Sequence, residues 1–199
     1  MQKTSLRPID ITLVALFAAM MAIGANVTSM ITIGTVPLTL QTLIATLAGI
    51  LLGSRLGALS MIVYTALGLM GPPIFAQMSG GLQTLASPTF GFILSFIIMA
   101  FVAGKITEKS DNPSYRTFAL AGTVALLINY LLGVHYFHYF QVFVLGLEDM
   151  RLAVSWSVML PLLIKDAILT ATSVSVLPRI YYAVQRSNKA TYSHKQTST

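Results

Sequence analysis

Long apolar stretches with almost no charge recur along the whole chain, and they limit most strongly what it can fold into. Of the 199 residues, 55% are hydrophobic and only 9% are charged. A soluble domain usually carries about 25% charged residues, so this chain has too few polar groups to cover a surface in water. Inside lipid every backbone N–H and C=O must be paired internally, which predicts that each stretch is a helix.

Hydropathy predicts about six membrane-spanning helices in one domain that covers residues 1–199. The expected spans are Asp10–Met30, Pro37–Leu52, Leu56–Met70, Pro88–Lys105, Arg116–Val144 and Val154–Tyr182. A proline removes one helical hydrogen bond, so we expect a break in the last span near Pro161. The polar residues from about 187 to 199 are expected to form a flexible tail. The predicted fold class is an all-α integral membrane protein.

Nearly all the cations fall on one side of this six-span arrangement. That side holds ten of the twelve Lys and Arg residues: Lys3, Arg7, Arg55, Lys105, Lys109, Arg116, Arg179, Arg186, Lys189 and Lys195. The other side holds Arg151, and Lys165 lies inside the last span. Because positive loops face the cytoplasm, we expect a cell-membrane protein with both termini in the cytoplasm. The net charge of +6 does not predict a nucleic-acid partner, since the cations do not gather on one arm.

Several kinds of active site are missing from the sequence. There is no cysteine, which excludes disulfides and thiolate metal ligands. The phosphate-binding glycine loop and the common hydrolase motifs are also absent. His135 and His138 have no acid near them and make a poor metal site. We therefore expect no enzyme activity, no metal and no cofactor, and any ATP hydrolysis must come from another chain.

Lys165 and Asp166 are the most informative residues, because they interrupt the last span a few residues after Pro161. An ionisable group at the centre of a bilayer costs at least about 2.5–3.5 kcal/mol and marks a functional site by default. The structural alternative is a lysine that reaches the headgroups beside an acid in the first turn of a helix. Consecutive side chains point about 100° apart and need not pair. We favour a substrate site, since no loop-like sequence surrounds the two residues.

Uncharged polar residues are further candidates for this site. Three of them, Thr39, Gln41 and Thr42, stand at the outer start of the second span, where they either face a central site or meet the headgroups. Asn129 lies midway along the fifth span, a place more typical of a hydrogen bond between helices than of a ligand contact. Aromatic residues, Tyr130 among them, crowd the outer half of that span and are interpreted as an interfacial belt.

The segment from 71 to 87 joins the third and fourth spans and has no charged residue. A solvated linker is polar, whereas this segment mixes prolines and glycines with apolar side chains. Its part at Ser79, Gly80 and Gly81 can bring backbone close to a ligand, because glycine permits positive φ angles. We interpret the segment as a loop packed against something else.

Four alanines form overlapping pairs of small residues on the first span. They are Ala15, Ala18, Ala19 and Ala22. Small residues four apart allow a neighbouring helix to approach closely. Spacing alone favours a neighbour in the same chain, and a helix of another protein is the alternative.

Between residues 36 and 104, short stretches occur in a recognisable order. They are Val36–Leu43, Leu47–Gly53, Gly57–Ser60, Gly71–Ala76, Gly80–Gly81 and Ser87–Phe92. Together they resemble the BioY family, the biotin-binding S components of energy-coupling factor (ECF) transporters. No stretch is diagnostic alone, but the ordered series is specific, and weaker similarity covers the first and last spans.

The resemblance implies a bundle of six helices that captures biotin near the outer membrane face. Such a subunit docks on a transmembrane coupling protein and two ABC-type ATPases, and the four alanines of the first span then contact the coupling protein. The resemblance also assigns Ser79, Gly80, Gly81 and Asp166 to the ligand pocket.

Some positions depart from the family pattern. Certain members have asparagine in place of Ser79, and glycines are common at the positions of Gln77 and Met78. The family often has a lysine three residues after the acid of the last helix, where this chain has Leu169. Lys165 lies one helical turn before Leu169 on the same face, and we infer that it supplies the missing cation.

The chemistry of these residues is compatible with biotin, which has a neutral ureido ring, an apolar body and an anionic tail. Asp166 is expected to accept a hydrogen bond from a ring N–H. Ser79 and the N–H groups of Gly80 and Gly81 are expected to donate to the ring carbonyl, and Lys165 to attract the tail.

Two other functions stay open at this point. A proton-coupled secondary transporter would use Asp166 as its proton relay, although the chain has no clear inverted repeat and only one carboxylate well inside a span. A structural membrane protein without a ligand is the other alternative.

Overall fold

The computed structural model describes residues 6–33, 36–147 and 149–196. The helices in these ranges are α1 (Pro8–Asn26), α2 (Gln41–Leu52), α3 (Ser54–Leu69), α4 (Phe90–Glu108), α5 (Tyr115–Tyr139) and α6 (Leu152–Gln196). The remaining elements are the strands β1 (Thr32–Ile33) and β2 (Val36–Pro37), the 3₁₀ turns η1 (Ala76–Met78) and η2 (Leu82–Ala86), and the π-helical turn η3 (Phe140–Val144). β1 and β2 pair antiparallel, with Ile33 opposite Val36.

Four of the described helices, α1, α4, α5 and α6, are long and apolar enough to cross a membrane. The helices α2 and α3 are apolar but shorter. The 12 residues of α2 rise only about 18 Å, whereas the hydrocarbon core of a bilayer is about 30 Å thick. The prediction of an all-α integral membrane protein with about six helices is confirmed, and two of these helices are too short to cross alone.

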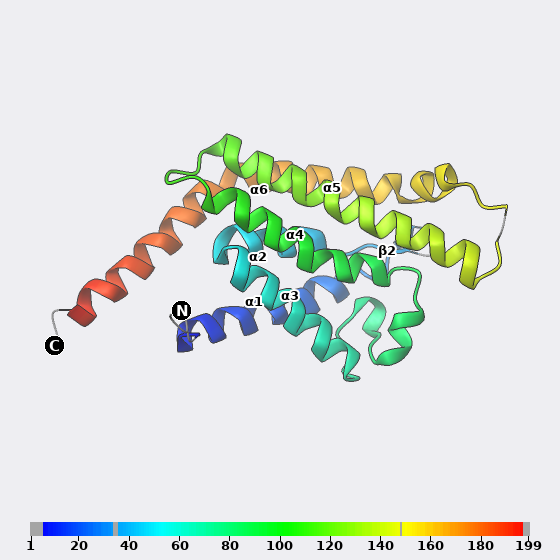
Figure 1. Cartoon of the computed structure of the whole chain (residues 1–199), viewed down its shortest axis with the longest axis horizontal. Coiled ribbons are helices and arrows are strands. Elements are labelled where there is room, and N and C mark those ends of the chain that lie inside the picture. The colour runs from blue at the N-terminus through cyan, green and yellow to red at the C-terminus, as the bar shows by residue number, and fades with distance from the viewer. Residues whose placement is uncertain (1–5, 34–35, 148, 197–199) are drawn as a thin grey trace, which may run out of the picture.

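The helices run roughly side by side in one bundle (Figure 1). α5 and α6 lie along one edge, and α1 and α3 lie along the other. α1 begins and α6 ends at the same end of the bundle, which we call the terminus end, and the last part of α6 projects beyond it. The long α3–α4 connection lies at the opposite end, called the loop end. A chain that passes through the membrane an even number of times has both termini at the same end.

Close backbone contacts hold the two short helices inside the bundle. A Cβ atom on Gly49 of α2 would collide with the carbonyl oxygen of Ala100 on α4. A Cβ atom on Gly57 of α3 would lie 2.7 Å from the Cα of Gly49. Gly53 has a φ of +85°, a conformation that glycine adopts without strain, and it lets the chain turn at once from α2 into α3.

The apolar core has two parts. The larger part lies among α1 to α5 and includes Met21, Met61 and Met99, which have no exposed surface. The smaller part lies between α5 and α6 and includes Phe137 and Met159. This second cluster fixes the portion of α6 that carries Lys165 and Asp166.

The boundaries of two predicted spans need correction. Pro37 belongs to β2, and the second helix begins only at Gln41, because the residue before a proline is held in extended backbone. The expected break near Pro161 is wrong, since α6 continues through Pro161 and Pro178. Proline removes a single donor, and in an apolar setting the other backbone groups are still best satisfied by a continuous helix.

The end of the chain was expected to be a flexible tail from about residue 187. The helical backbone of α6 extends to Gln196, and residues 197–199 lie outside the described residues. The flexibility of this segment stays a prediction.

Candidate functional site

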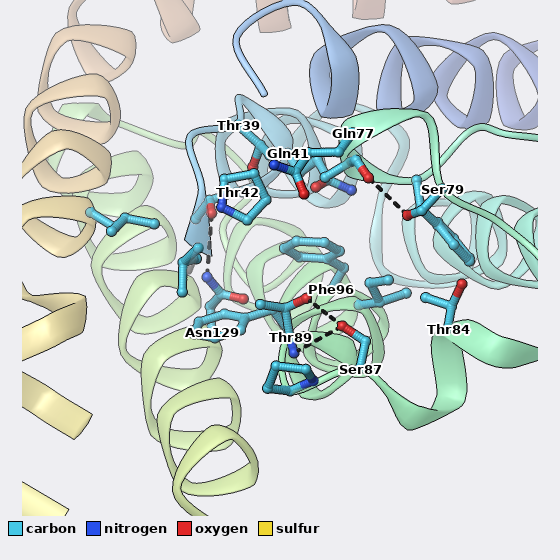
Figure 2. Close-up of a pocket in the computed structure, with 18 of the residues that line it drawn as sticks. Thr39, Gln41, Thr42, Gln77, Ser79, Thr84, Ser87, Thr89, Phe96 and Asn129 are labelled. Atoms are coloured by element: carbon cyan, nitrogen blue, oxygen red, sulfur yellow. Dashed lines mark hydrogen bonds between the residues drawn. The ribbon is translucent and has the colours of Figure 1, made fainter. Parts of the chain in front are cut away.

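A cavity of about 340 Å³ lies at the loop end of the bundle. Small-molecule sites usually have volumes of about 300–1,000 Å³. One side, the helical wall, consists of Gln41, Thr42, Asn129, Tyr130, Lys165 and Asp166. The other side, the loop wall, consists of Gln77, Ser79, Gln83, Thr84, Ser87 and Thr89. Figure 2 shows Thr42 and Asn129 on the left, Thr84 on the right, and the ring of Phe96 between them.

Asp166 lies at the centre of the helical wall and is 4% exposed. Its Oδ2 accepts hydrogen bonds from Thr42 Oγ1 at 3.0 Å and from the Tyr130 hydroxyl at 2.8 Å. Its Oδ1 lies 2.8 Å from Nζ of Lys165. Three helices, α2, α5 and α6, therefore meet at one carboxylate. This arrangement supplies the charge partner that a buried carboxylate needs and donors to Oδ2, whereas Oδ1 is buried without a hydrogen-bond partner among the described residues.

Lys165 makes its polar contacts within the protein. Besides its ion pair with Asp166, Nζ donates to the backbone carbonyl of Thr39. The sequence left this pairing open, because consecutive side chains leave a helix in different directions, and the long lysine side chain bridges that difference. Among the described residues that line the cavity, Lys165 is the one cation and Asp166 the one anion. The helical wall therefore carries no net charge.

Asn129 connects one further helix, α4, to the carboxylate. Its Oδ1 accepts from Ser95 Oγ on α4 at 2.6 Å, and its Nδ2 donates to Thr42 Oγ1 on α2 at 3.3 Å. Thr42 in turn donates to Asp166. The hydrogen bond between helices that the sequence favoured is present, and the same side chain also lines the cavity.

Gln41 connects the cavity to the loop that covers it. Its Nε2 donates to the hydroxyl of Tyr64 at 2.8 Å, and that hydroxyl donates to the carbonyl of Ile74 at 3.2 Å. Gln41 is buried, and Thr39 beside it is half-buried and lines the cavity. Both residues therefore belong to the site rather than to the headgroup region.

Asn26, the last residue of α1, holds the loop from the other side. Its Oδ1 accepts from the backbone N–H of Met78 at 2.8 Å, and its Nδ2 donates to the carbonyl of Ile74 at 3.3 Å. Between these anchors, Gln77 and Met78 have φ angles of +58° and +53°. Glycine adopts this left-handed region most easily, and these are the two positions where the family pattern has glycines.

The predicted serine and glycines of the loop have different positions. Ser79 lines the cavity, and its Oγ donates to a carbonyl of the same turn at 2.8 Å. Gly80 and Gly81 are buried but are not among the lining residues. A Cβ on Gly80 would collide with the carbonyl oxygen of Pro72, and the N–H of Gly81 donates to Gly68 at 2.7 Å. The N–H of Gly81 therefore already has a partner at the end of α3, and the expected donation from Gly81 to a ligand would require this bond to break.

Sequence reasoning missed several lining residues. Tyr130 was interpreted as part of an aromatic belt, but it is 3% exposed and donates to Asp166. Its position next to a mid-span asparagine was the available signal. Thr84, Ser87 and Thr89 carried no signal at all, since hydroxyl residues are ordinary in a loop. Only the path of the loop brings them to the cavity.

The four alanines of α1 lie on two faces of the helix. Ala15 and Ala19 are exposed, whereas Ala18 is 5% exposed and packs in the apolar core, with the half-buried Ala22 against it. Ala18 and Ala22 thus have the neighbour within the chain that spacing alone favoured. Only Ala15 and Ala19 stay available to another protein.

The two histidines near the loop end contact different partners. Nδ1 of His135 lies 2.6 Å from the carbonyl of Leu131, and Nδ1 of His138 lies 3.2 Å from Ser155 Oγ. Across the described residues, no three His, Cys, Asp or Glu side chains come together as a possible metal site.

Comparison with known proteins matches residues 1–186 to the BioY family. The putative biotin transporter BioYB of Bacillus subtilis (strain 168) is 34% identical over 208 residues, which cover 98% of both chains. The probable biotin transporter BioY of Pyrococcus horikoshii is 35% identical over 171 residues, 86% of this chain and 95% of that one.

The fold also resembles a solved structure. The S-component for biotin from an ECF-type ABC transporter, known from a crystal structure at 2.1 Å, superposes with a TM-score of 0.67. The match covers 88% of this chain and 94% of that chain at 23% identity. The predicted S-component-like bundle is confirmed.

Proposed function

This chain belongs to the BioY family, and on that premise we propose that it is the biotin-binding S component of an ECF-type importer. It captures biotin at the outer face of the membrane, and separate ATPase chains supply the energy for uptake. Its relatives are named as transporters, and its role is transport rather than catalysis.

The observation that carries this proposal is the ion pair of Lys165 and Asp166 in an otherwise uncharged cavity. A pair with no net charge suits a neutral but strongly polar group such as the ureido ring. A ring N–H can donate to Asp166 in a charge-assisted hydrogen bond. The rings of Phe92 and Phe96 line the same cavity and suit the apolar body of biotin.

Isothermal titration of the purified protein with biotin tests this function. We expect Asp166→Asn to weaken binding by more than tenfold, or about 1.4 kcal/mol, because a charged acceptor is lost. Asp10→Asn is the matched control. Asp10 is also buried and paired, with Arg7 at 2.6 Å, but it lies at the terminus end. It should bind biotin like the unmodified protein.

Two results would contradict the proposal in different ways. A folded unmodified protein that binds no biotin would remove the function itself. Unchanged affinity in a folded Asp166→Asn variant would remove Asp166 from the site and leave the function standing.

We propose that both termini face the cytoplasm, so that the loop end and its cavity face outward. The distribution of cations supports this orientation. Because the chain has no cysteine, a single Gln83→Cys variant gives a clean test. Gln83 is exposed beside the cavity, and a membrane-impermeant maleimide should label it in intact cells. Labelling only after the cells are opened would reverse the orientation.

We also propose that Ala15 and Ala19 form part of the surface that contacts a transmembrane coupling protein, itself bound to two ABC-type ATPases. Both residues are exposed on α1, and small side chains permit close helix approach. Ala19→Trp should abolish uptake in cells but leave biotin binding unchanged. Ala119→Trp, at an exposed alanine on α5, is the control. Co-purification of Ala19→Trp with the coupling protein at normal yield would contradict this contact.

A further inference from the structure

The loop wall holds hydroxyl groups with unused hydrogen-bonding capacity. Thr84 is 8% exposed, and its Oγ1 has no hydrogen-bond partner among the described residues. Ser87 Oγ and Thr89 Oγ1 lie 3.0 Å apart and share one hydrogen bond. Since each hydroxyl has one proton, one of these two protons is left over. A buried hydroxyl without a partner costs free energy, so an acceptor that enters the cavity beside Thr84 recovers it.

The same wall contains the beginning of a long helix. α4 starts at Phe90 and has 19 residues, and the side chain of its N-cap residue, Thr89, makes no capping hydrogen bond. Pro88 and Thr89 line the cavity. The N-terminus of a helix carries a partial positive charge, which favours an anion. In α4 the N–H groups of Phe90 and Phe92 already donate to the carbonyls of Ser87 and Thr89, so the hydroxyls of the loop wall are the donors left for a ligand. The unpartnered hydroxyl of Thr84 and the positive end of α4 therefore both favour a negatively charged acceptor at the loop wall.

The helical wall offers an anion much less. Nζ of Lys165 is already engaged by the Asp166 carboxylate and by the carbonyl of Thr39. An anionic group placed there would also lie beside the carboxylate of Asp166. Like charges at such distances repel, and the repulsion is strong in a site with little water.

We propose that the carboxylate of the bound ligand lies at the N-terminus of α4, held by the hydroxyls of Thr84 and of the Ser87–Thr89 pair, and not at Lys165. This inference rests on the proposed biotin-binding function and fixes the orientation of the ligand in the site. The polar, neutral ring then faces Asp166, and the tail crosses the cavity toward the loop wall. It replaces the expectation from sequence that Lys165 attracts the tail.

A comparison of two ligands on the full-length protein tests the orientation. Biotin carries the carboxylate, and in biotin methyl ester this group is converted into a neutral ester. Thr84→Val removes the hydroxyl and keeps the shape of the side chain. Titration should show about a tenfold loss of biotin affinity in Thr84→Val, but at most about a twofold loss for the ester, because the hydroxyl acts mainly on the charged group.

Two further variants make the comparison decisive. Thr65→Val is the matched control, since Thr65 is equally buried, donates to a carbonyl of its own helix and does not line the cavity. It should leave both affinities unchanged. Lys165→Gln should weaken both ligands by similar factors, because it acts through Asp166 on the ring. Ser87→Ala should repeat the pattern of Thr84→Val, and it serves as the test if that variant does not fold.

The outcomes separate this inference from the function on which it rests. If the unmodified protein binds neither ligand, the proposed function fails and the orientation fails with it. If it binds biotin but Thr84→Val and Ser87→Ala each lower the affinity for biotin and for its ester by the same factor, only the orientation is overturned. A loss in Lys165→Gln that affects biotin and spares the ester would place the carboxylate at the lysine instead.

Discussion

The two walls of the cavity are built from different material. On the helical wall, Thr42, Tyr130 and Lys165 all point at the carboxylate of Asp166, and each of them comes from a helix packed in the bundle. On the loop wall, the hydroxyl of Thr84 has no partner among the described residues. Oδ1 of Asp166 also has no hydrogen-bond partner among the described residues, but it lies beside the charge of Lys165. The helical wall thus has an acceptor to offer a ligand, whereas the loop wall has a donor.

The backbone of the loop wall also depends more on outside contacts than the backbone of the helical wall does. Helical backbone satisfies its own hydrogen bonds, but the loop contains Gln77 and Met78 at positive φ. Such residues cost about 1–3 kcal/mol each and persist only where the surroundings hold them. Here Asn26 keeps Met78 in place, because its side chain accepts a hydrogen bond from the backbone N–H of Met78. The proposed site thus joins a wall of packed helices to a loop whose conformation depends on contacts from outside the loop.

The largest effect is expected when the charge balance of the helical wall is broken. Lys165→Met leaves the carboxylate of Asp166 buried without its counter-charge, and the loss of one partner of a buried pair costs about 3–5 kcal/mol of stability. The double variant Lys165→Met with Asp166→Asn should recover most of this loss. Gln83→Met, on the loop wall, should cost no more than about 1 kcal/mol, because Gln83 is exposed and loses a single hydrogen bond, to the carbonyl of Gly80. Unfolding in detergent measures all three, and a double variant as unstable as the single one would break the comparison.

A smaller effect is expected when one hydroxyl is removed from each side of the cavity. Tyr130 and Tyr136 both lie on α5. The first donates to Asp166 and the second to the carbonyl of Leu85 in the loop, at 3.2 Å. Tyr130→Phe should weaken biotin binding about tenfold, because it removes a hydrogen bond to a charged group. Tyr136→Phe should weaken it by no more than about twofold, since water can replace a bond at an exposed carbonyl. Equal losses of biotin affinity for the two variants in titration would contradict the difference between the two walls.

The smallest effect concerns the backbone of the loop. Gln77→Gly places glycine where φ is +58°, so relief of strain offsets the greater freedom of the unfolded chain. The thermal midpoint without ligand should stay the same or rise slightly. Ala76→Gly, one residue earlier and not at positive φ, gains no such relief and should lose about 0.4–1 kcal/mol. A lower midpoint for Gln77→Gly than for Ala76→Gly would show that the loop is not strained there.

The helices could be predicted from sequence because lipid leaves the backbone few choices. Apolar stretches separated by cations located the spans to within a few residues. The start of α2 at Gln41 depends on the pairing of β1 and β2, which is too short to read from sequence. Pro161 predicts a break on local grounds, but Met159 and Leu162 on either side of it are buried in the cluster between α5 and α6, and the helix continues through it.

The site could be predicted where a residue was out of place in its surroundings. Lys165, Asp166 and Asn129 interrupt apolar spans, and all three line the cavity. Tyr130 and Thr84 are ordinary residues for a membrane interface and a loop, and only the neighbouring Asn129 set Tyr130 apart from the other aromatic residues. Their role depends on which side chain they meet in three dimensions, and that follows from packing rather than from composition.

One hydrogen-bonded chain, from Ser95 through Asn129 and Thr42 to Asp166, passes through four helices in turn. On the proposed function, a mutation anywhere along it would disturb the assembly of the bundle as well as the binding of the ligand, so natural selection can rarely alter it alone. Substitutions in the loop wall carry no such double penalty. Relatives that diverge toward a different vitamin or a modified tail are therefore expected to keep the buried chain and to vary at the positions of Gln77, Thr84 and Ser87.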